Sequence, residues 1–293
     1  MLYKKKLPLF IFLLPGFIIM LVFLYVPFID NIINSLYDMT SVVRMQGQEF
    51  KFIGIDNYKN LFIDPKIRIA IINSLKMMGL TIVFQIGTAL ILAILVNSIK
   101  HGRNFFRIVF FFPVVISATA IGLIFQLFYN YKGGMLNQLM ESLGKSPINW
   151  LAPEIAFLMI CIPTLWSYVG FYFVILLTGI NGISDELYEA ADIDGCSKFK
   201  QIFYITLPLL RGVICTCITL GVTGALKVFD LPWAIVPKGA PQGLTHFFGT
   251  YMYEQTFTIG NYDYGSTIAL LIVIFGVGIS WIVSKIIKPD ANL

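Results

Sequence analysis

The 293-residue chain is 57% hydrophobic and only 13% charged, whereas an average soluble domain carries about 25% charged residues. Its apolar residues come in runs of about 20, which match the hydrocarbon thickness of a bilayer. The composition therefore predicts an integral membrane protein, and the net charge of +5 reflects loops near lipid headgroups rather than a nucleic-acid partner.

Hydropathy along the chain predicts an all-α polytopic fold with six membrane-spanning helices. The first follows three lysines at positions 4–6, a pattern that a cleaved signal peptide also has. Its apolar run of about 23 residues is longer than a typical signal-peptide core and precedes no small-residue cleavage site, which favours an uncleaved anchor. The predicted spans cover residues 7–29, 70–97, 108–130, 155–180, 212–231 and 264–287.

The distribution of lysine and arginine predicts the direction of these spans. If the N-terminus is cytoplasmic, the inner segments carry 11 of these residues in 57 positions, and the outer loops carry 8 in 93. Cytoplasmic loops are normally the richer ones, so both termini are expected inside. Residues 1–293 are expected to form one transmembrane domain, with an anchor and external loop over 1–69 and a core over about 70–287. The loop 31–69 is the one segment long enough for a small external cap.

One segment differs from this apolar background, because residues 185–194 hold five of the sixteen carboxylates. Ser184 is placed to cap a helix, and the acidic residues of the first turn suit its dipole. Gly195 is placed to end the helix in a left-handed conformation. Four residues recur at helical spacing and share a face: Ile183, Leu187, Ala190 and Ala191.

A second short helix is predicted directly after Gly195. Ser197 can cap it, its apolar side includes Phe199, Ile202 and Phe203, and Pro208 is expected to end it and to open the fifth span. Residues 183–210 are therefore expected to form a helix-turn-helix bracket on the cytoplasmic face, between the fourth and fifth spans. An ordinary solvated loop is the alternative, although such a loop needs neither a small-residue face nor a glycine stop.

The sequence EAADIDGCSKFKQIFYITLPLL within this bracket resembles the EAA loop of permease subunits in binding-protein-dependent ABC importers. The family pattern is EAA, then an aspartate-glycine pair two residues later, then I-x-LP. Cys196 stands where alanine is usual, and Ser184 stands where proline is common. The positions that fit are Glu189, Ala190, Ala191, Asp194, Gly195, Ile205, Leu207 and Pro208.

The resemblance extends over nearly the whole chain. FIGIDNYKNLF, from Phe52, resembles the first external loop of the carbohydrate-type permeases, and its GIDNY segment favours the type of the glycerol-phosphate, multiple-sugar and maltose F-type subunits. RNFFRIVFFFP, from Arg103, resembles the segment before their third helix. KVFDLPWAIVPKGAPQGLT, from Lys227, resembles their F-D…T-x-G-G-P…T segment, with Pro237 replacing the threonine and Ala240 one glycine. Further matching positions are Asn137, residues 149–151, Trp166 and Gly170.

This resemblance implies a type-1 importer permease subunit for a sugar, in particular an oligosaccharide, in a bacterial-type cytoplasmic membrane. It implies three kinds of partner: a second, different permease, two cytosolic ATPase subunits that bind ATP and magnesium, and an external solute-binding protein. The EAA loop would dock in a cleft of the ATPase and move the fourth and fifth spans. The residues given this coupling role are Glu189, Ala190, Ala191, Asp194, Gly195, Leu187, Phe199, Leu207 and Pro208.

The chain itself is not expected to hydrolyse ATP or to bind a cofactor or a metal. The sequence at 144–146 resembles the end of a P-loop, but that pattern needs a glycine where Leu139 stands. His101 and His246 fall in opposite loops, and the four cysteines suggest neither a disulfide framework nor a metal site.

Polar residues inside spans are costly in lipid and often mark a transport pathway. Lys227 and Asp230 could pair at i, i+3, while Lys76 either lines a pathway or extends to the membrane surface. Trp166 and Tyr172 lie inside the fourth span and are better candidates for sugar contacts than aromatics at span ends, although packing within the protein explains both residues better than a sugar contact does. The predicted pathway residues are Lys227, Asp230, Lys76, Tyr172, Trp166, Gln126 and Asn130.

Two other classes of protein are alternatives. A self-sufficient secondary transporter or channel would not need the bracket, and the sequence has neither an inverted repeat nor a carboxylate-lined span. A polytopic membrane enzyme would need a cluster of catalytic side chains beyond the bracket. Within the family, the cargo could also be an acidic or phosphorylated sugar, with Lys76 and Lys227 supplying positive charge.

Overall fold

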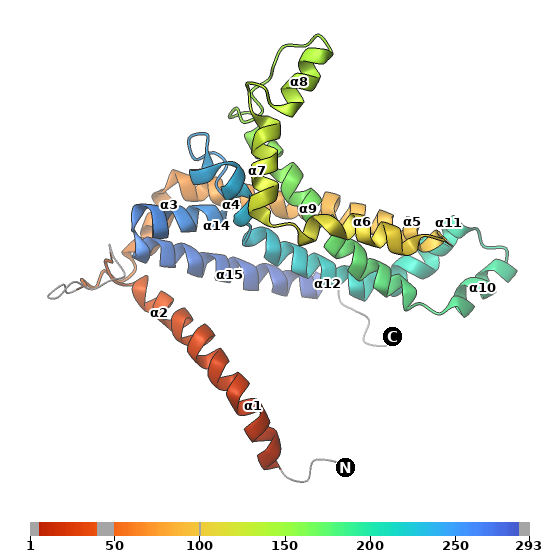
Figure 1. Cartoon of the computed structure of the whole chain (residues 1–293). Helices are drawn as coiled ribbons and strands as arrows, with labels where there is room; N and C mark the ends of the chain where they lie inside the picture. Colours follow the sequence, from red (N-terminus) through yellow and green to blue (C-terminus); the bar gives the residue numbers. More distant parts are fainter. Residues whose placement is uncertain (1–5, 40–49, 100, 287–293) are drawn as a thin grey trace. The chain divides into compact units, whose positions relative to one another are not determined.

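The structure, a computed structural model, describes residues 6–39, 50–99 and 101–286 (Figure 1). The lysines at positions 4 and 5, the middle of the predicted external loop and Ile287, which ends the predicted sixth span, fall outside these ranges. The described residues are almost entirely helical and contain no strand, and one isolated antiparallel bridge joins Tyr37 to Phe52. The predicted all-α class is therefore confirmed.

The chain divides into two compact units, residues 1–64 with 252–273 and residues 65–251 with 274–293. Each unit is described by itself. The described helices of the first unit are α1 (Lys6–Met20), η1 (Leu21–Tyr25), α2 (Val26–Asn34), α3 (Asp56–Ile63), η5 (Glu254–Ile259) and the first half of α15 (Tyr262–Ile286).

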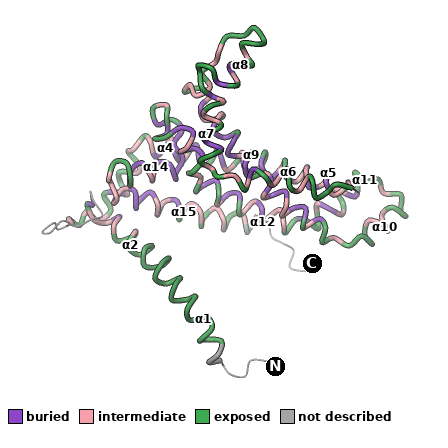
Figure 2. The backbone as a smooth tube through the Cα atoms, in the orientation of Figure 1, coloured by how far each residue is buried: buried purple, intermediate pink, exposed green. Residues whose placement is uncertain are grey.

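In the first unit, the apolar stretch Leu9–Asn34 has no buried residue (Figure 2). Its 26 residues are long enough to cross a bilayer, and exposed apolar side chains suit a helix that faces lipid. Polar contacts join α3 and the residue after it to the start of α15. The Asn57 amide donates to the Asp263 carboxylate at 3.0 Å, and the Tyr264 hydroxyl donates to Asp64 at 2.8 Å.

The second unit contains the remaining helices. In chain order they are α4 (Pro65–Leu80), η2 (Thr81–Ile86), α5 (Gly87–Ser98), α6 (Arg103–Val115), α7 (Ala118–Tyr129), α8 (Met135–Ser142), α9 (Ala156–Asn181), α10 (Asp185–Ile193), α11 (Lys198–Gln201), η3 (Ile202–Thr206), α12 (Leu207–Leu226), α13 (Asp230–Ile235), η4 (Pro237–Gly239), most of α14 (Phe248–Tyr253) and the second half of α15.

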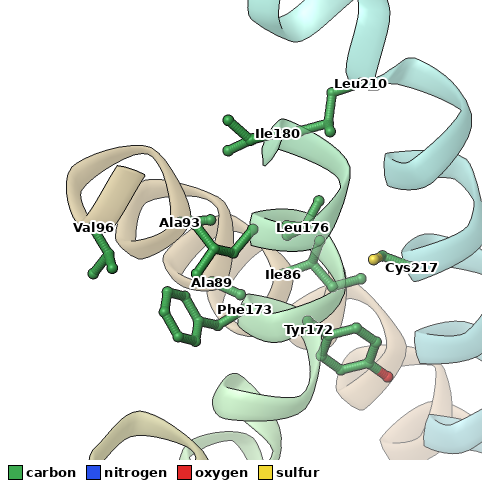
Figure 3. Close-up of a cluster of buried hydrophobic side chains, with 11 residues drawn as sticks. Ile86, Ala89, Ala93, Val96, Tyr172, Phe173, Leu176, Ile180, Leu210 and Cys217 are labelled. Carbon is green, nitrogen blue, oxygen red and sulfur yellow. The ribbon is translucent and has the colours of Figure 1, made fainter. Parts of the chain in front are cut away.

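Helix α9 is the central helix of this unit and packs against α5, α6 and α12. Glycines allow these helices to approach closely, as is common in membrane proteins. A Cβ at Gly170 would overlap the backbone carbonyl of Phe110 on α6, and a Cβ at Gly179 would lie 2.7 Å from Leu210 on α12. Figure 3 shows the buried cluster at these contacts, which comprises Ile86, Ala89, Ala93, Val96, Tyr172, Phe173, Leu176, Leu177, Ile180, Leu210 and Cys217.

Among the residues that the structure describes, five helical stretches are long and apolar enough to cross a membrane, and a bent pair of helices gives a sixth candidate. The five are Leu9–Asn34, Pro65–Ser98, Ala156–Asn181, Lys198–Ile235 and Tyr262–Val283, and the bent pair is α6 with α7.

The prediction that residues 108–130 form one continuous helix was wrong, although the bent pair remains a candidate for the third span. Helices α6 and α7 meet at an angle of 88°, because Ile116 and Ser117 have extended backbones with ψ of 137° and 133°. Pro113 lacks an amide for the helical ladder, and β-branched residues, which lose side-chain freedom in a helix, occupy positions 114–116.

The prediction that Pro208 ends the second bracket helix was also wrong. Residues 198–226 form one unbroken helical stretch, of which η3 is a π-helical turn. The Leu207 amide bonds to the Ile202 carbonyl, so the ladder widens to i→i−5 directly before Pro208. Pro208 then occupies the first turn of α12, a position that tolerates the missing amide.

A hairpin that contains α8 extends from the end of α7 (Figure 1). It is organised by Asn137, which is fully buried. The Asn137 amide donates to the carbonyls of Tyr131 and Ile148 at 3.0 and 2.9 Å. Its carbonyl oxygen accepts from the Ile148 amide and from the Trp150 indole at 3.0 and 2.9 Å.

We expect Asn137→Leu to loosen this hairpin, because each orphaned buried polar group costs about 1–3 kcal/mol. Limited proteolysis should then cut residues 131–151 at least several-fold faster than in the wild type. Gln138→Leu is the matched control, because Gln138 also donates to a carbonyl, that of Gly133, but is exposed. Equal cleavage of the two variants would contradict the structural role of Asn137.

Candidate functional site: the bracket and two cavities

The predicted bracket is present as α10, a turn and α11, at one end of the second unit (Figure 1). The Ser184 hydroxyl accepts from the Glu186 amide at 3.3 Å, and the Ser197 hydroxyl accepts from the Lys200 amide at 3.4 Å. Gly195 has φ of +72° and lies in the turn. The predicted caps and the predicted glycine stop are therefore confirmed.

The surface of α10 is open, since none of its residues is buried (Figure 2). Apolar side chains of the bracket are among the exposed ones: Leu187 is 46% exposed, Ile193 87% and Phe199 70%. The charged and small residues of the EAA sequence share this exposure. Glu189, Ala190, Asp194, Gly195 and Pro208 are exposed, while Ala191 and Leu207 are half-buried.

A polar clasp, formed by Asp192, Lys198 and Gln201, closes the turn of the bracket. The Lys198 ammonium donates to both carboxylate oxygens of Asp192, at 2.8 and 2.7 Å. Gln201 is only 2% exposed. Its side-chain amide donates to the Asp192 carboxylate at 2.7 Å and to the Cys196 carbonyl at 3.3 Å. The clasp therefore joins the end of α10 to α11.

The hydrogen bonds from Lys198 and then from Gln201 hold the pKa of Asp192 below its ordinary value. The clasp therefore contributes fully above the ordinary carboxyl pKa and is lost only when the pH falls through the lowered value. The clasp is not predictable from the sequence, because an aspartate and a lysine six positions apart across a glycine turn match no helical spacing.

A cavity of about 870 Å³ lies between the bracket and the ends of α5, α6 and α9. We call it the bracket cavity. Arg103, at the start of α6, is on its wall and donates from Nε to the Ile99 carbonyl at 2.7 Å and from Nη2 to the Asn97 carbonyl, so it caps the end of α5. Other residues of the wall are Ile180, Asp185, Tyr188, Gln201 and Thr206.

A second cavity, of about 340 Å³, lies among η2, the break between α6 and α7, α9 and the end of α12. We call it the inner cavity. Its wall mixes apolar side chains with hydroxyl, amide and charged groups, a mixture that suits a polar solute with apolar faces. The polar residues of the wall are Thr81, Gln85, Thr164, Ser167, Tyr168, Tyr172, Lys227 and Asp230.

Three of the predicted pathway residues line the inner cavity: Tyr172, Lys227 and Asp230. The predicted pair between Lys227 and Asp230 does not form, since no hydrogen bond or ion pair joins these two residues among the described contacts. The reason is local. Helix α12 ends at Leu226, and Phe229 has φ of −143°, so the helical i, i+3 spacing is lost.

The other four predicted pathway residues do not line this cavity. The Gln126 amide instead donates to the carbonyls of Ala234 and Ile235, at 2.8 and 3.0 Å, and so caps α13. Lys76 is exposed and places its ammonium 5.5 Å from the centre of the Phe157 ring. Trp166 and Asn130 are both exposed.

Two polar residues of the inner cavity that sequence reasoning missed are Gln85 and Ser167. Gln85 could have been noticed as an uncharged amide in an otherwise apolar run. Its Nε2 donates to the Leu165 carbonyl at 2.8 Å, so it joins η2 to α9.

Pro163 lies inside α9 and has no amide that could donate to the Met159 carbonyl, four residues earlier. The Tyr129 hydroxyl donates to that carbonyl instead, at 2.8 Å.

All four cysteines are free thiols. Within the described ranges, no group of three or more histidine, cysteine or acidic side chains has a geometry that could hold a metal ion.

Several membrane-length helices surround a polar-lined cavity and carry an exposed charged bracket, an arrangement that suits a component of a membrane transport system. Residues 85–290 match the family of binding-protein-dependent transport system inner membrane components, and the chain belongs to this family. It is accordingly a multi-pass protein of the inner membrane.

Named relatives agree with this assignment. The probable ABC transporter permease protein YurN of Bacillus subtilis is 34% identical over 290 residues, which are 97% of each chain. The arabinooligosaccharides transport system permease protein AraP of the same organism is 30% identical over 97% of this chain and 90% of its own. A bacterial ABC transporter involved in the import of the acidic polysaccharide alginate has the same fold, with a TM-score of 0.85, 23% identity and coverage of 99% and 98%.

Proposed function

We propose that this chain is a permease subunit of an ATP-driven importer whose cargo is a sugar, in particular an oligosaccharide. Residues 1–293 form a single transmembrane domain with six spans and both termini in the cytoplasm, and the chain forms half of the translocation pathway beside a second, different permease. The relative named for arabinooligosaccharide transport supports this class of cargo. The excess of lysine and arginine in the inner segments supports the orientation.

The exposed bracket is the observation that carries the proposal. A cytosolic ATPase subunit docks on α10, where Glu189, Ala190 and Leu187 are all exposed. Two small residues, Ala190 and Ala191, let the partner approach the helix closely, and the exposed apolar side chains would be buried by it. Several large apolar side chains are exposed on this one short segment, including Ile193 at 87% and Phe199 at 70%, and exposed apolar side chains that lie close together are typical of an interaction surface.

Hydrolysis of ATP, with its magnesium ion, takes place on two such ATPase subunits and not on this chain. A solute-binding protein delivers the sugar to the external side. The family description, a binding-protein-dependent transport component, supports the solute-binding protein. The relative named as a probable ABC transporter permease supports the ATPase partner, and both argue against a transporter that works alone.

The sugar contacts the inner cavity during transport. Tyr168 and Tyr172 provide aromatic faces there, and Ser167 and Thr81 provide hydroxyl groups. Aromatic and hydroxyl-bearing side chains together suit a sugar ring, which has apolar faces and a polar edge.

Co-purification from native membranes in mild detergent tests the assembly. We expect a second permease and an ATPase to accompany this chain, and we expect ATP-dependent sugar uptake after reconstitution of the complex into vesicles. Recovery of this chain alone, still moving solute without ATP, would refute the proposal.

An acidic or phosphorylated sugar is a second candidate cargo, favoured by the position of Lys227 on the wall of the inner cavity without a salt bridge to Asp230. Lys76 no longer supports this idea, because it lies outside that wall.

We expect Lys227→Ala to reduce uptake of an acidic sugar about tenfold and uptake of a neutral sugar by less than twofold, because one charge contact is worth about 1–2 kcal/mol at a partly solvated site. Competition between radiolabelled neutral and acidic sugars measures this difference. Lys76→Ala is the matched control and should change neither uptake. Equal effects of Lys227→Ala on both sugars would remove Lys227 from cargo recognition.

A further inference from the structure

We infer that the bracket drives the transport helices through its connection to α12, with the clasp joining α10 rigidly to that helix and residues 182–184 acting as a hinge between α10 and α9. This inference rests on the proposed function. The inference refines that proposed function, because an EAA loop that lies between two helices could move either helix.

The first support is the helical continuity of residues 198–226. The Ile202 amide bonds to the Lys198 carbonyl, and the Leu207 amide bonds to that of Ile202. Gln201 and Thr206, at the two ends of η3, both have helical backbone angles. At about 1.5 Å per residue this stretch is about 40 Å long. We call this continuous helix, residues 198–226, the rod. A displacement of α11 is therefore transmitted along the rod into α12.

The second support is the way in which α10 is attached to that rod. The clasp binds Asp192, at the end of α10, to Lys198 and Gln201. A second contact, 2.9 Å between the hydroxyls of Tyr188 and Thr206, joins the middle of α10 to η3. Two separate points of attachment fix the angle between the two helices, whereas a single point would allow rotation.

The third support is the looser connection to α9. Ser184 has an extended backbone, with ψ of 133°, and Gly182 adds no side chain. The amides of Gly182 and Ile183 bond back to the carbonyls of Gly179 and Ile180, so they complete α9 and do not hold α10. Among the described residues, no side-chain hydrogen bond joins α10 to α9.

The bracket cavity gives this motion room. It separates α10 from the ends of α5 and α9, so the bracket can tilt without pressing on them. At its far end the rod reaches the inner cavity, whose wall includes Leu220, Gly221, Gly224 and Ala225 of α12. Movement of α12 along its axis or about it would therefore reshape that wall.

Two separate variants, each with two glycines inserted at one end of the bracket, test the inference. One insertion, between Phe203 and Tyr204, interrupts the rod within η3, and the matched insertion, between Gly182 and Ile183, lengthens the hinge. In the reconstituted complex we expect the first to lower sugar uptake per ATP hydrolysed at least tenfold, with the ATPase still bound. We expect the second to keep this ratio within twofold of the wild type.

Loss of coupling by the hinge insertion, or normal coupling with the rod insertion, would overturn the inference. Failure of the wild-type complex to show ATP-driven uptake would instead refute the proposed function, so the two failures are distinguishable.

A second set of variants tests the clasp without altering chain length. Asp192→Asn should lower uptake per ATP several-fold, and the exchanged pair Asp192→Lys with Lys198→Asp should restore it. The exchange also places lysine at the end of α10 and aspartate in the first turn of α11, where each suits the helix dipole. Asp56→Asn, which breaks an exposed 2.8 Å pair with Lys59 on α3, is the control and should have no effect. Unchanged coupling in Asp192→Asn would remove the clasp from transmission.

Discussion

Replacement of Gly195 by proline is expected to abolish sugar uptake and ATPase docking while the chain still inserts into the membrane. Gly195 has φ of +72°, whereas proline fixes φ near about −65°. Proline would also remove the amide that donates to the Asp192 carbonyl at 3.1 Å. The turn would open, and α10 and α11 would lose the relative orientation that the partner recognises.

Gly195→Ala separates the backbone effect from a general loss of the protein. No atom lies within 4 Å of a Cβ at this position, so alanine meets only the strain of a left-handed backbone, about 1–2 kcal/mol. We expect partial uptake with alanine and none with proline, measured in vesicles beside co-purification of the ATPase. Full uptake by the proline variant would exclude the bracket from coupling.

Glu189→Lys tests the docking surface with the turn left intact. Glu189 is exposed on α10 and has no described partner within the chain, so its charge is available to a docked subunit. We expect the reversal of charge to release the ATPase and stop uptake, with no change in thermal stability of the isolated chain.

Gly170→Ala is expected to destabilise the second unit strongly. The added methyl group would meet the backbone of Phe110 and Phe111 on α6, and backbone cannot move aside as a side chain can. Overpacking of this kind costs about 1–3 kcal/mol and sometimes more. We therefore expect the melting temperature of the purified protein to fall by about 5 °C or more.

Gly79→Ala is the matched control for this substitution. Gly79 is also a helical glycine, on α4, but nothing lies within 4 Å of a Cβ there. Alanine has the higher helix propensity, by about 0.8–1.0 kcal/mol, so the melting temperature should stay the same or rise. A similar fall in both variants would mean that the contact between α6 and α9 is not what Gly170 protects.

Local chemistry accounts for the features that were predicted correctly. Ser184, Ser197 and Gly195 act within a few residues of their own positions, so capping and turn rules suffice to place them. The resemblance to the EAA loop then identified the family that the comparison confirms. The role of that loop in coupling remains a prediction.

Some errors have local causes and others depend on distant residues. Pro113 and the β-branched residues after it favour the bend between α6 and α7, and α12 ends at Leu226; hydropathy averages over both interruptions and reads continuous apolar runs. Gln126 was predicted to line a pathway but instead caps α13, a helix more than 100 positions away in the chain. No local pattern reveals which carbonyls a buried amide will reach.

The sequence by itself determined that this is a helical membrane protein with a capped, charged bracket, because bilayer thickness and helix capping act on neighbouring residues. Only the tertiary structure decided which residues share a cavity and which helix continues from the bracket. Those outcomes depend on close packing, such as that of Gly170 against α6, and on the π-helical turn that carries the helix past Pro208. Close packing and the change from α-helical to π-helical hydrogen bonding depend on many residues at once. A pattern of residues along the chain therefore does not predict them.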